Sequence, residues 1–479
     1  MPDIASREAA LARAIVERAS SVPPTIRALA CEHIADFAGV AAAGLGSDSF
    51  ARISRTLAPQ PAQSQSAARV WGGAGWLPAR DAAMLNAVAG HVDDFDDDEA
   101  ELSLAHPTVT ILTAAGAAAD LVTVPGSRLV EAYVAGVELV MRLGAMLNPA
   151  HYTRGFHATA TLGALGAAVS AGLVLGLDRE RLRHALGIAA SLAGGLRSNF
   201  GSDTKSLQTG NAARSGLMAA ELARDGVSST PGSLFGPLGF VPVFGGRVPP
   251  DDIAEAFGAP WLIDAPGITI KAYPCCTCAH TALDSLFALM AEHRIEPQRI
   301  LRIEVDVDEA APRILIHDNA RTALEGKFSM PFCLAAGLLR GRLGLAEFDD
   351  ALVLAPETRS LMERVVICPD PSLPKPDGRI TLASRLRLLL QDGTVLERHT
   401  QQPSGSRSHR LSKDQLSAKF TANAASRLGP TCKEVFETLL ALDRLPDAAR
   451  GFDALCSAAR FDPRASRQDL IDGPIALQH

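Results

Sequence analysis

Four short polar stretches carry the residue types that acid–base chemistry needs. The first, GHVDDFDDDEAELSLAHP (90–107), gathers aspartates and glutamates ahead of His106. The others are RGFHATATLGALGAA with His157, GSDTKSLQTGNAARSG with Lys205, and IKAYPCCTCAH with Lys271. Imidazoles can transfer protons near neutral pH, and lysines can hold anionic groups. Each stretch alone is a weak signal, since a single His or Lys beside apolar residues is usually structural and a carboxylate block is usually a solvated turn.

These stretches do not match the common metal or nucleotide motifs. Cys275, Cys276, Cys278 and His280 fall within six residues, whereas structural zinc sites usually use two separated pairs of ligands. The acidic block lacks the glycine at which an EF-hand loop turns, and the sequence has no P-loop and no GxGxxG after a strand. We therefore predict a reaction without a metal or other cofactor.

The run DDFDD (93–97) also satisfies DDxxD, the magnesium–diphosphate motif of all-helical prenyl-transferring enzymes and terpene synthases. Those enzymes need a second acidic motif and aromatic walls, and only 5% of this chain is aromatic. A thermal-shift comparison of magnesium plus diphosphate against citrate or itaconate separates this alternative from acid–base chemistry on a carboxylate.

Helical periodicity dominates the sequence up to about residue 265, where these polar stretches must be positioned. Apolar residues at three- and four-residue spacing predict helices in residues 1–19, 23–45, 81–92, 127–147 and 211–226. The uncharged run between His157 and Asp178 consists mainly of Ala, Gly, Thr and Ser. It favours a buried bundle helix over a membrane span.

Strand patterns appear after residue 265. A half-buried strand over 301–308 is predicted by apolar residues that alternate with charged ones: Leu301, Ile303, Val305 and Val307. The Asp392-Gly393 pair predicts a hairpin between two apolar runs. A helix is expected at 328–341, and helical patterns return at 412–428 and 432–442.

These patterns predict a mainly α protein with an α+β part. A large all-helical domain would be built from both chain ends, residues 1–265 and 405–479. A smaller α+β lid domain, residues 266–404, would be inserted between them. The Pro-rich stretches 59–69 and 370–379 are expected to be loops.

The overall composition excludes some partners. The chain is 47% hydrophobic and 21% charged, with a net charge of -7 and no Lys/Arg-rich run, so a nucleic-acid partner is not expected. Eight cysteines at irregular spacing, without a secretory signal, predict reduced thiols, a cytoplasmic location and no membrane partner.

In combination, the polar stretches form an ordered set of motifs. DFDD followed by HP precedes GFH-x-T-x-x-x-G-x-x-G, G-x-x-TK-x-L-x-x-G-x-AA-x-x-G, K-x-YP-x-C-x-x-x-H and KFS-x-P. This set resembles the MmgE/PrpD family over about residues 10–455. Members of that family eliminate water, lose carbon dioxide or invert a carbon centre.

The resemblance implies a cofactor-independent lyase acting on a small di- or tricarboxylate through a carbanion or enolate, by dehydration or decarboxylation. Epimerisation of an amino- or imino-dicarboxylate is the alternative on the same scaffold. The resemblance also implies a cleft between an all-helical domain and a lid, and a homodimer. A member that binds a ligand without catalysis remains a further alternative.

Five residues are the predicted catalytic groups under this resemblance. His106 and His157 suit proton transfer because histidine titrates near neutrality. Lys205 and Lys271 can pair with substrate carboxylates, and Asp94 can orient a histidine or bind a protonated substrate. We expect the acidic block to form one wall of the cleft, with Asp94 and His106 facing in. The remaining aspartates are expected to be turn formers and helix caps.

The predicted substrate-binding residues are Asp98, Gln208, Tyr273, Cys276, His280 and Phe332. Three of them depart from the usual family pattern, because Asp98 replaces a common Thr, Gln208 a frequent His and Phe332 a common Tyr. A carboxylate at Asp98 would repel a substrate carboxylate or favour an amino or hydroxyl group. The substrate is therefore expected to carry fewer carboxylates than a tricarboxylate, or a nitrogen.

Overall fold

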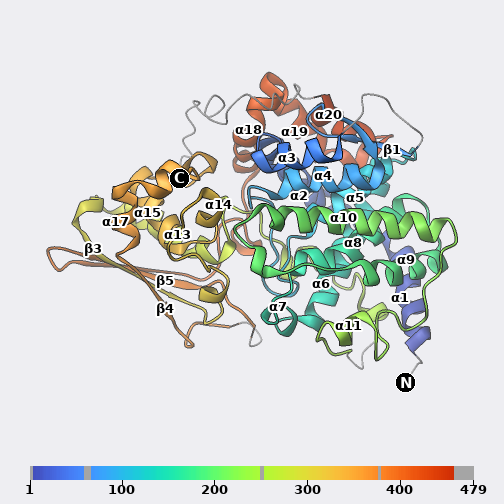
Figure 1. The fold of residues 1–479 in the computed structure, drawn as a ribbon, viewed down its shortest axis with the longest axis horizontal. Helices are drawn as coiled ribbons and strands as arrows, with labels where there is room; N and C mark the ends of the chain where they lie inside the picture. Colours follow the sequence, from blue (N-terminus) through green and yellow to red (C-terminus); the bar gives the residue numbers. More distant parts are fainter. Residues whose placement is uncertain (1–3, 59–65, 249–252, 376–378, 458–479) are drawn as a thin grey trace.

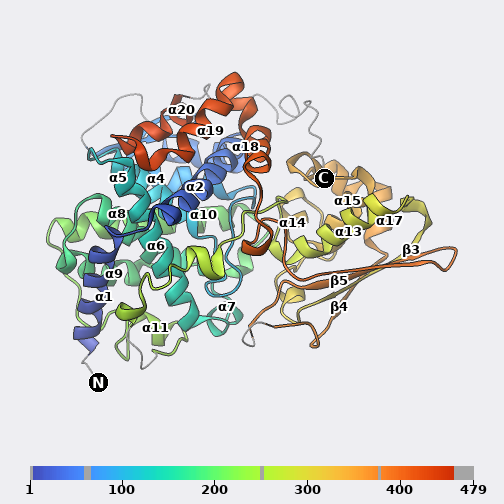
Figure 2. The same cartoon turned by 180° about the vertical axis from the view of Figure 1, so that it is seen from behind.

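Helices form a large body, and a four-stranded sheet with its own helices forms a smaller part beside it (Figure 1, and from behind in Figure 2). The computed structural model describes residues 4–58, 66–248, 253–375 and 379–457. We call the two parts the body and the lid. The prediction of a mainly α protein with an α+β part is confirmed.

The body combines elements from both sides of the lid in the sequence. They are α1 (Ile4–Ala19), α2 (Pro24–Gly44), α3 (Asp48–Leu57), β1 (Ala67–Val70), β2 (Gly75–Pro78), α4 (Ala79–His91), α5 (Pro107–Ala119), α6 (Gly126–Leu147), α7 (Ala150–Thr153), α8 (Ala158–Val174), α9 (Arg179–Leu192), α10 (Asp203–Arg224), α11 (Phe240–Val243), α12 (Ile253–Ala256), α18 (Lys413–Leu428), α19 (Cys432–Leu440) and α20 (Asp453–Ser457). Every helix predicted from periodicity in this part is confirmed, with residues 1–3 outside the described residues.

Helix α8 lies at the centre of the body, and all its residues are buried. Its neighbours include α5, α6, α9 and α10 (Figure 1). Small residues permit this packing, because a Cβ on Gly136 of α6 would lie 2.8 Å from the backbone oxygen of Gly166 on α8. A Cβ on Gly216 of α10 would lie 2.4 Å from the Cβ of Ala167. The uncharged run is therefore a buried bundle helix, as predicted.

The lid consists of α13 (His280–Glu292), β3 (Ile300–Val307), α14 (Ala323–Gly326), α15 (Met330–Arg340), α16 (Asp350–Leu354), α17 (Pro356–Met362), β4 (Val365–Pro369), β5 (Ser384–Leu390) and β6 (Val395–Thr400). Its sheet has the order β4-β3-β5-β6, in which β3 runs parallel to β4 and antiparallel to β5. Helices α13 and α15 pack against the strands (Figure 1). The predicted hairpin is confirmed as β5–β6, with Gly393 at a φ of 84° in the turn.

Two local predictions are wrong. Leu301 was expected in the core, but it is 62% exposed, because the register of β3 against β5 shifts between Ile300 and Arg302 and Ile300 takes the buried position. Residues 67–69 were expected in a loop but belong to strand β1, which pairs with β2. Residues 59–65 and 376–378 of the two expected loops lie outside the described residues.

The chain enters and leaves the lid at adjacent points of the body. The N–H of Ile270 donates to the carbonyl oxygen of Gly405 at 3.1 Å. The lid has a hydrophobic core of its own, although Ile268, Ile270, Ile314 and Phe328 pack with the core of the body. We propose domain boundaries at residues 266 and 404 on this basis; residues 458–479 of the predicted helical domain lie outside the described part.

All eight cysteines are free. Across the described residues, no single helix has the length and apolar character to cross a membrane, although the bent pair α2 and α3 meets both measures jointly.

Candidate active site

Three helices of the body begin beside one pocket. His106 immediately precedes α5 and His157 immediately precedes α8, and neither side chain caps its helix. Lys205 lies in the first turn of α10. Thr159 ties two of these ends together, since its hydroxyl accepts the backbone N–H of His106 at 3.0 Å. The partial positive charge at the helix starts favours an anionic ligand and disfavours a protonated imidazole.

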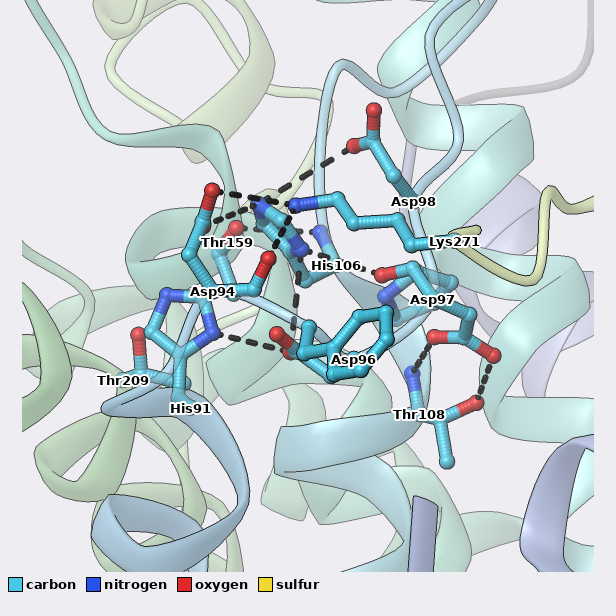
Figure 3. A network of polar contacts seen from close by, with 12 residues as sticks. His91, Asp94, Asp96, Asp97, Asp98, His106, Thr108, Thr159, Thr209 and Lys271 are labelled. Carbon is cyan, nitrogen blue, oxygen red and sulfur yellow. Dashed lines mark hydrogen bonds and ion pairs between the residues drawn. The ribbon is translucent and has the colours of Figure 1, made fainter. Parts of the chain in front are cut away.

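Asp94 is the centre of the acidic loop and adopts the left-handed φ of 51° (Figure 3). Its carboxylate accepts from the Lys205 Nζ at 2.7 Å and lies 3.1 Å from the Lys271 Nζ. Lys271 also donates to the backbone oxygen of Asp94 at 2.9 Å. Two ammonium groups, one from the body and one from the lid, therefore share one buried carboxylate.

The charges of this cluster support one another. Although burial favours the neutral acid, Lys205 and Lys271 hold the pKa of Asp94 well below its usual range. Burial likewise opposes the charged form of Lys271, but the carboxylates of Asp94, Asp98 and Asp96 raise its pKa. Asp94 and Lys271 are therefore both ionised at neutral pH.

The neighbouring aspartates are buried hydrogen-bond partners of histidines, whereas the sequence predicted turn formers and helix caps. Asp96 accepts from Nδ1 of His91 at 2.8 Å. Asp97 accepts from Nδ1 of His33 at 2.9 Å and also bonds the N–H and the hydroxyl of Thr108, in the first turn of α5 (Figure 3). The structure thus corrects the expected role of Asp96, and gives Asp97 a capping role alongside its hydrogen bond with His33.

A lid lysine completes the support of the acidic loop. Lys327 donates to the backbone oxygen of Asp93 at 2.7 Å and to that of Pro274 at 3.2 Å. The DDxxD carboxylates therefore point to separate protein partners, with only Asp94 among them lining the pocket. This arrangement offers no shared face for magnesium diphosphate.

Hydrogen bonds fix the tautomer of His157. The amide of Gln208 is oriented by Leu196, whose N–H donates to Oε1 at 3.1 Å and whose carbonyl accepts from Nε2 at 3.2 Å. Oε1 therefore faces Nδ1 of His157 at 3.0 Å, so Nδ1 carries the proton. The buried Nε2 of His157 has no partner among the described residues, and its residue lines the pocket. A neutral His157 thus presents a lone pair to a ligand.

His106 has a similar arrangement. Its Nδ1 donates to the backbone oxygen of Asp97 at 3.0 Å, and its Nε2 lies 3.7 Å from the Asp94 carboxylate (Figure 3). Burial, together with Lys271 and Lys205, holds the pKa of His106 well below its usual range. Burial, Lys205 and His91 do the same for the pKa of His157. Both histidines are neutral in the ligand-free protein at pH 7.

The structure brings most of the predicted site residues together. Those that line the pocket are Asp94, Asp98, His106, His157, Lys205, Lys271 and Cys276. Gln208 does not line the pocket, but its Oε1 bonds Nδ1 of His157, which does. Tyr273, His280 and Phe332 are not among the lining residues, because Tyr273 donates to Asp284, His280 faces the Cys275 carbonyl oxygen and Phe332 packs against Phe348 in the lid core.

Several further residues line the pocket but were not among the predicted site residues. Thr159, Phe328 and Cys278 stand in the quoted motifs, whereas the motifs gave no sign of Tyr152 and Phe200. His91 was also missed, although its Nε2 accepts from Lys205 at 2.6 Å. Its position directly before the acidic block, at the end of α4, is the one clue that the sequence offered.

Four side chains offer donor atoms that a metal ion could use. The donors of His91, Asp94, Asp96 and His106 all lie within 4.8 Å of one another. Two of these residues already have cationic partners, because Lys205 bonds both His91 and Asp94. A divalent ion would have to share this space with two buried ammonium groups, which suits anion binding better than metal binding.

The fold and the pocket together define a buried acid–base site between a helical body and a lid. Residues 10–252 match the MmgE/PrpD N-terminal domain, and residues 273–443 match the MmgE/PrpD C-terminal domain. The chain therefore belongs to the MmgE/PrpD family, which confirms the resemblance found in its motifs.

Three relatives share a similar sequence over most of their length. Cis-aconitate decarboxylase of Mus musculus is 29% identical over 426 residues, which cover 86% of this chain and 85% of that protein. Cis-aconitate decarboxylase of Homo sapiens is 28% identical and covers 78% of both chains. That of Aspergillus terreus is 28% identical and covers 76% of this chain and 79% of its own.

Proposed function

We propose that this chain is a lyase that removes carbon dioxide from a small unsaturated carboxylate without a metal or organic cofactor. Family membership and the names of the relatives support a carboxy-lyase. The observation that carries the proposal is the pair of buried ammonium groups on Asp94 beside the unpartnered Nε2 of His157. Cations for a carboxylate and a neutral proton-transfer group thus line one pocket.

In the proposed reaction, the bond between the substrate carbon and the leaving carboxylate breaks, and its electron pair stays on the substrate. Conjugation carries this charge toward a second carboxylate, where Lys205 and Lys271 stabilise it. Carbon dioxide leaves, and the imidazolium of His157 gives a proton to the carbanion. The proton stays on the product carbon as the new C–H bond, and His157 takes up a fresh proton from solvent, so each turnover consumes one proton and releases one carbon dioxide. Dehydration of a hydroxylated substrate would use the same groups in a different order.

His157 must gain this proton when the substrate binds. It is neutral in the free protein, but a substrate carboxylate near Nε2 favours the charged imidazole and raises its pKa. Binding should therefore take up about one proton at pH 7.5. Calorimetry with a carboxylate ligand, in buffers of different ionisation enthalpy, measures this uptake directly. Binding without proton uptake would contradict the proposed donor.

The reaction itself is tested by incubating the protein with a panel of dicarboxylates and tricarboxylates in deuterated water, with EDTA present. We expect NMR to show loss of carbon dioxide and deuterium at the carbon that lost it. Activity that disappears with EDTA and returns with zinc or magnesium would contradict the cofactor-independent mechanism. No turnover across the panel would favour a member that only binds a ligand.

Epimerisation of an amino- or imino-dicarboxylate is a second candidate, which Asp98 favours because a carboxylate in the pocket can bind a cationic nitrogen. Deuterium that enters the substrate without loss of mass identifies this reaction.

We also propose a cytoplasmic homodimer without nucleic-acid or membrane partners, and light scattering of the purified protein tests the dimer.

A further inference from the structure

Asp98 is held rigidly at the pocket. Its backbone N–H donates to the oxygen of Thr269 at 2.9 Å, and the N–H of Thr269 donates back to the oxygen of Asp98 at 2.8 Å. These two bonds fix Asp98 to the segment that leads into Lys271. The side chain of Asp98 is 14% exposed, against 3% for Asp94, so Asp98 is the more accessible of the two pocket carboxylates.

The carboxylates of Asp98 and Asp94 both face Nε2 of His106 (Figure 3). The nearest cationic or imidazole contact of Asp98 is this Nε2 of His106, at 4.0 Å. Lys205 and Lys271 instead lie 2.7 and 3.1 Å from the carboxylate of Asp94. Asp98 therefore presents negative charge to the pocket without a close ammonium partner of its own.

The charge balance of the pocket follows from these contacts. Among the described residues that line it, the only lysines are Lys205 and Lys271, and no arginine is present. Two ammonium groups face two carboxylates, Asp94 and Asp98, so the lining has no excess positive charge when Asp98 is ionised. Burial raises the pKa of Asp98 to about 6; Lys271 opposes this rise, and the carboxylates of Asp94 and Glu99 reinforce it. Asp98 is therefore ionised at pH 8.

We propose that Asp98 is a specificity-determining residue that excludes a third carboxylate from its end of the pocket. A ligand with two carboxylates can use the lysine pair and place a neutral or hydrogen-bond-donating group beside Asp98. A ligand with three must bring one carboxylate next to another carboxylate. The inference rests on the proposed function, in that it takes this pocket as the substrate site.

Two ligands isolate the third carboxylate. Citraconate and cis-aconitate share a cis-butenedioate core, and citraconate has a methyl group where cis-aconitate has a carboxymethyl group. Their dissociation constants are measured by calorimetry at pH 8 on the whole protein, the Asp98→Asn variant and the Asp225→Asn variant. Asp225 is a matched control, since it changes the net charge equally but its side chain is 72% exposed and outside the pocket lining.

We expect Asp98→Asn to lower the dissociation constant of cis-aconitate at least about tenfold and to change that of citraconate less than about twofold. The reason is that only the tricarboxylate loses a like-charge contact. Asp225→Asn should change neither. Equal effects of Asp98→Asn on both ligands, or none on either, would overturn the inference. Binding by the wild-type protein without turnover of any panel compound would refute the proposed lyase while leaving this comparison intact. If neither ligand bound the wild-type protein or either variant, the pocket would not be a carboxylate site.

Discussion

At the scale of single residues, the lysine pair on Asp94 makes activity and stability inseparable. Both ammonium groups are buried, and both pair with the one buried carboxylate of Asp94. A variant that removes one lysine therefore changes the folded state as well as the chemistry. Stability and turnover must therefore be measured on the same variant.

Lys271→Met is expected to lower kcat about a hundredfold and to lower the free energy of unfolding by about 3 kcal/mol. The stability loss comes from the Asp94 carboxylate, which keeps Lys205 as its sole ammonium partner among the described contacts. Adding Asp94→Asn should lower the free energy of unfolding further and restore no activity, because the buried Lys205 ammonium then loses its carboxylate partner. Urea denaturation and steady-state kinetics measure the two quantities. A double variant that recovers activity would contradict the proposed role of Lys271.

Gln208→Glu tests the tautomer and charge of His157. A carboxylate 3.0 Å from Nδ1 would favour the imidazolium and raise the pKa of His157. Since the proposed donor is the protonated form, the alkaline limb of the kcat/KM profile should move to higher pH by about one unit. Gln208→Met, which removes the hydrogen bond and adds no charge, should lower the rate without that movement. An unmoved profile in both variants would make His157 a structural residue.

Asp98→Asn should show a pH-dependent gain in stability. The folded pKa of Asp98 is raised from 3.8 to about 6, so its stabilising contribution is complete below the unfolded value and is lost as pH rises through 6. Asparagine cannot ionise, so the variant should be more stable than the wild type by about 1–3 kcal/mol at pH 8. The difference should shrink by about 1 kcal/mol at pH 5. Denaturant unfolding at both pH values measures it; a difference that grows toward pH 5 would contradict the shift.

Residue types and order indicated much of this site. Lys205, Lys271, His106 and His157 stood in recognisable motifs, and all of them line the pocket. Lys327 stands in the KFS-x-P motif, but its role was not predicted, because it bonds two backbone oxygens that sequence spacing does not connect to it. Tyr273, His280 and Phe332 lie in or near a matching motif, but their side chains turn toward the lid interior, which depends on tertiary packing.

At the scale of elements, periodicity predicted the helices well because each buries a continuous stripe or, for α8, its whole surface. Strand details were less accessible. The bulge that exposes Leu301 arises from pairing between β3 and β5, which are far apart in sequence. Strand β1 is four residues long, too short for an alternation pattern to identify.

The crossing of α8 and α10 allows a matched test of close packing. In Gly216→Ala, the new Cβ would lie 2.4 Å from the Ala167 Cβ and 2.6 Å from backbone atoms of α8, so the helices must separate. We expect a loss of about 1–3 kcal/mol, despite the better helix propensity of alanine. Gly116→Ala in α5 has open space, with its nearest atom 3.9 Å away, and should stabilise by up to about 1 kcal/mol. Thermal unfolding compares them; equal effects would contradict the packing argument.

At the scale of the whole molecule, two lid lysines bind one loop of the body. Lys271 bonds Asp94, and Lys327 bonds the Asp93 backbone as well as Pro274 of the lid. The pocket is therefore complete only when the lid is seated on the body. Substrate affinity should depend on this seating even where no side chain contacts the ligand.

Lys327→Met should weaken that seating. We expect faster amide hydrogen exchange in residues 271–278 and a KM raised about tenfold, with a smaller change in kcat, since Lys327 is absent from the pocket lining. Lys375→Met is the control, because Lys375 pairs only with Asp308 and Glu309 within the lid among the described contacts. Exchange that rises equally in both variants would show a general loss of stability and no seating role.

The bond between Ile270 and Gly405 has a consequence for protein engineering. The two segments that connect the lid to the body meet at this bond, where the Ile270 nitrogen lies 3.1 Å from the Gly405 oxygen. A side chain at Gly405 would collide with the Ile270 oxygen. The lid is thus an inserted domain whose first and last residues lie side by side, and the position at its end, Gly405, requires glycine. A lid from another family member, joined at these two residues, would reach the same acidic loop without rerouting the helical scaffold. Chimeras joined at Ile270 and Gly405 can exchange the lid's share of the pocket lining while His106 and His157 of the body stay unchanged.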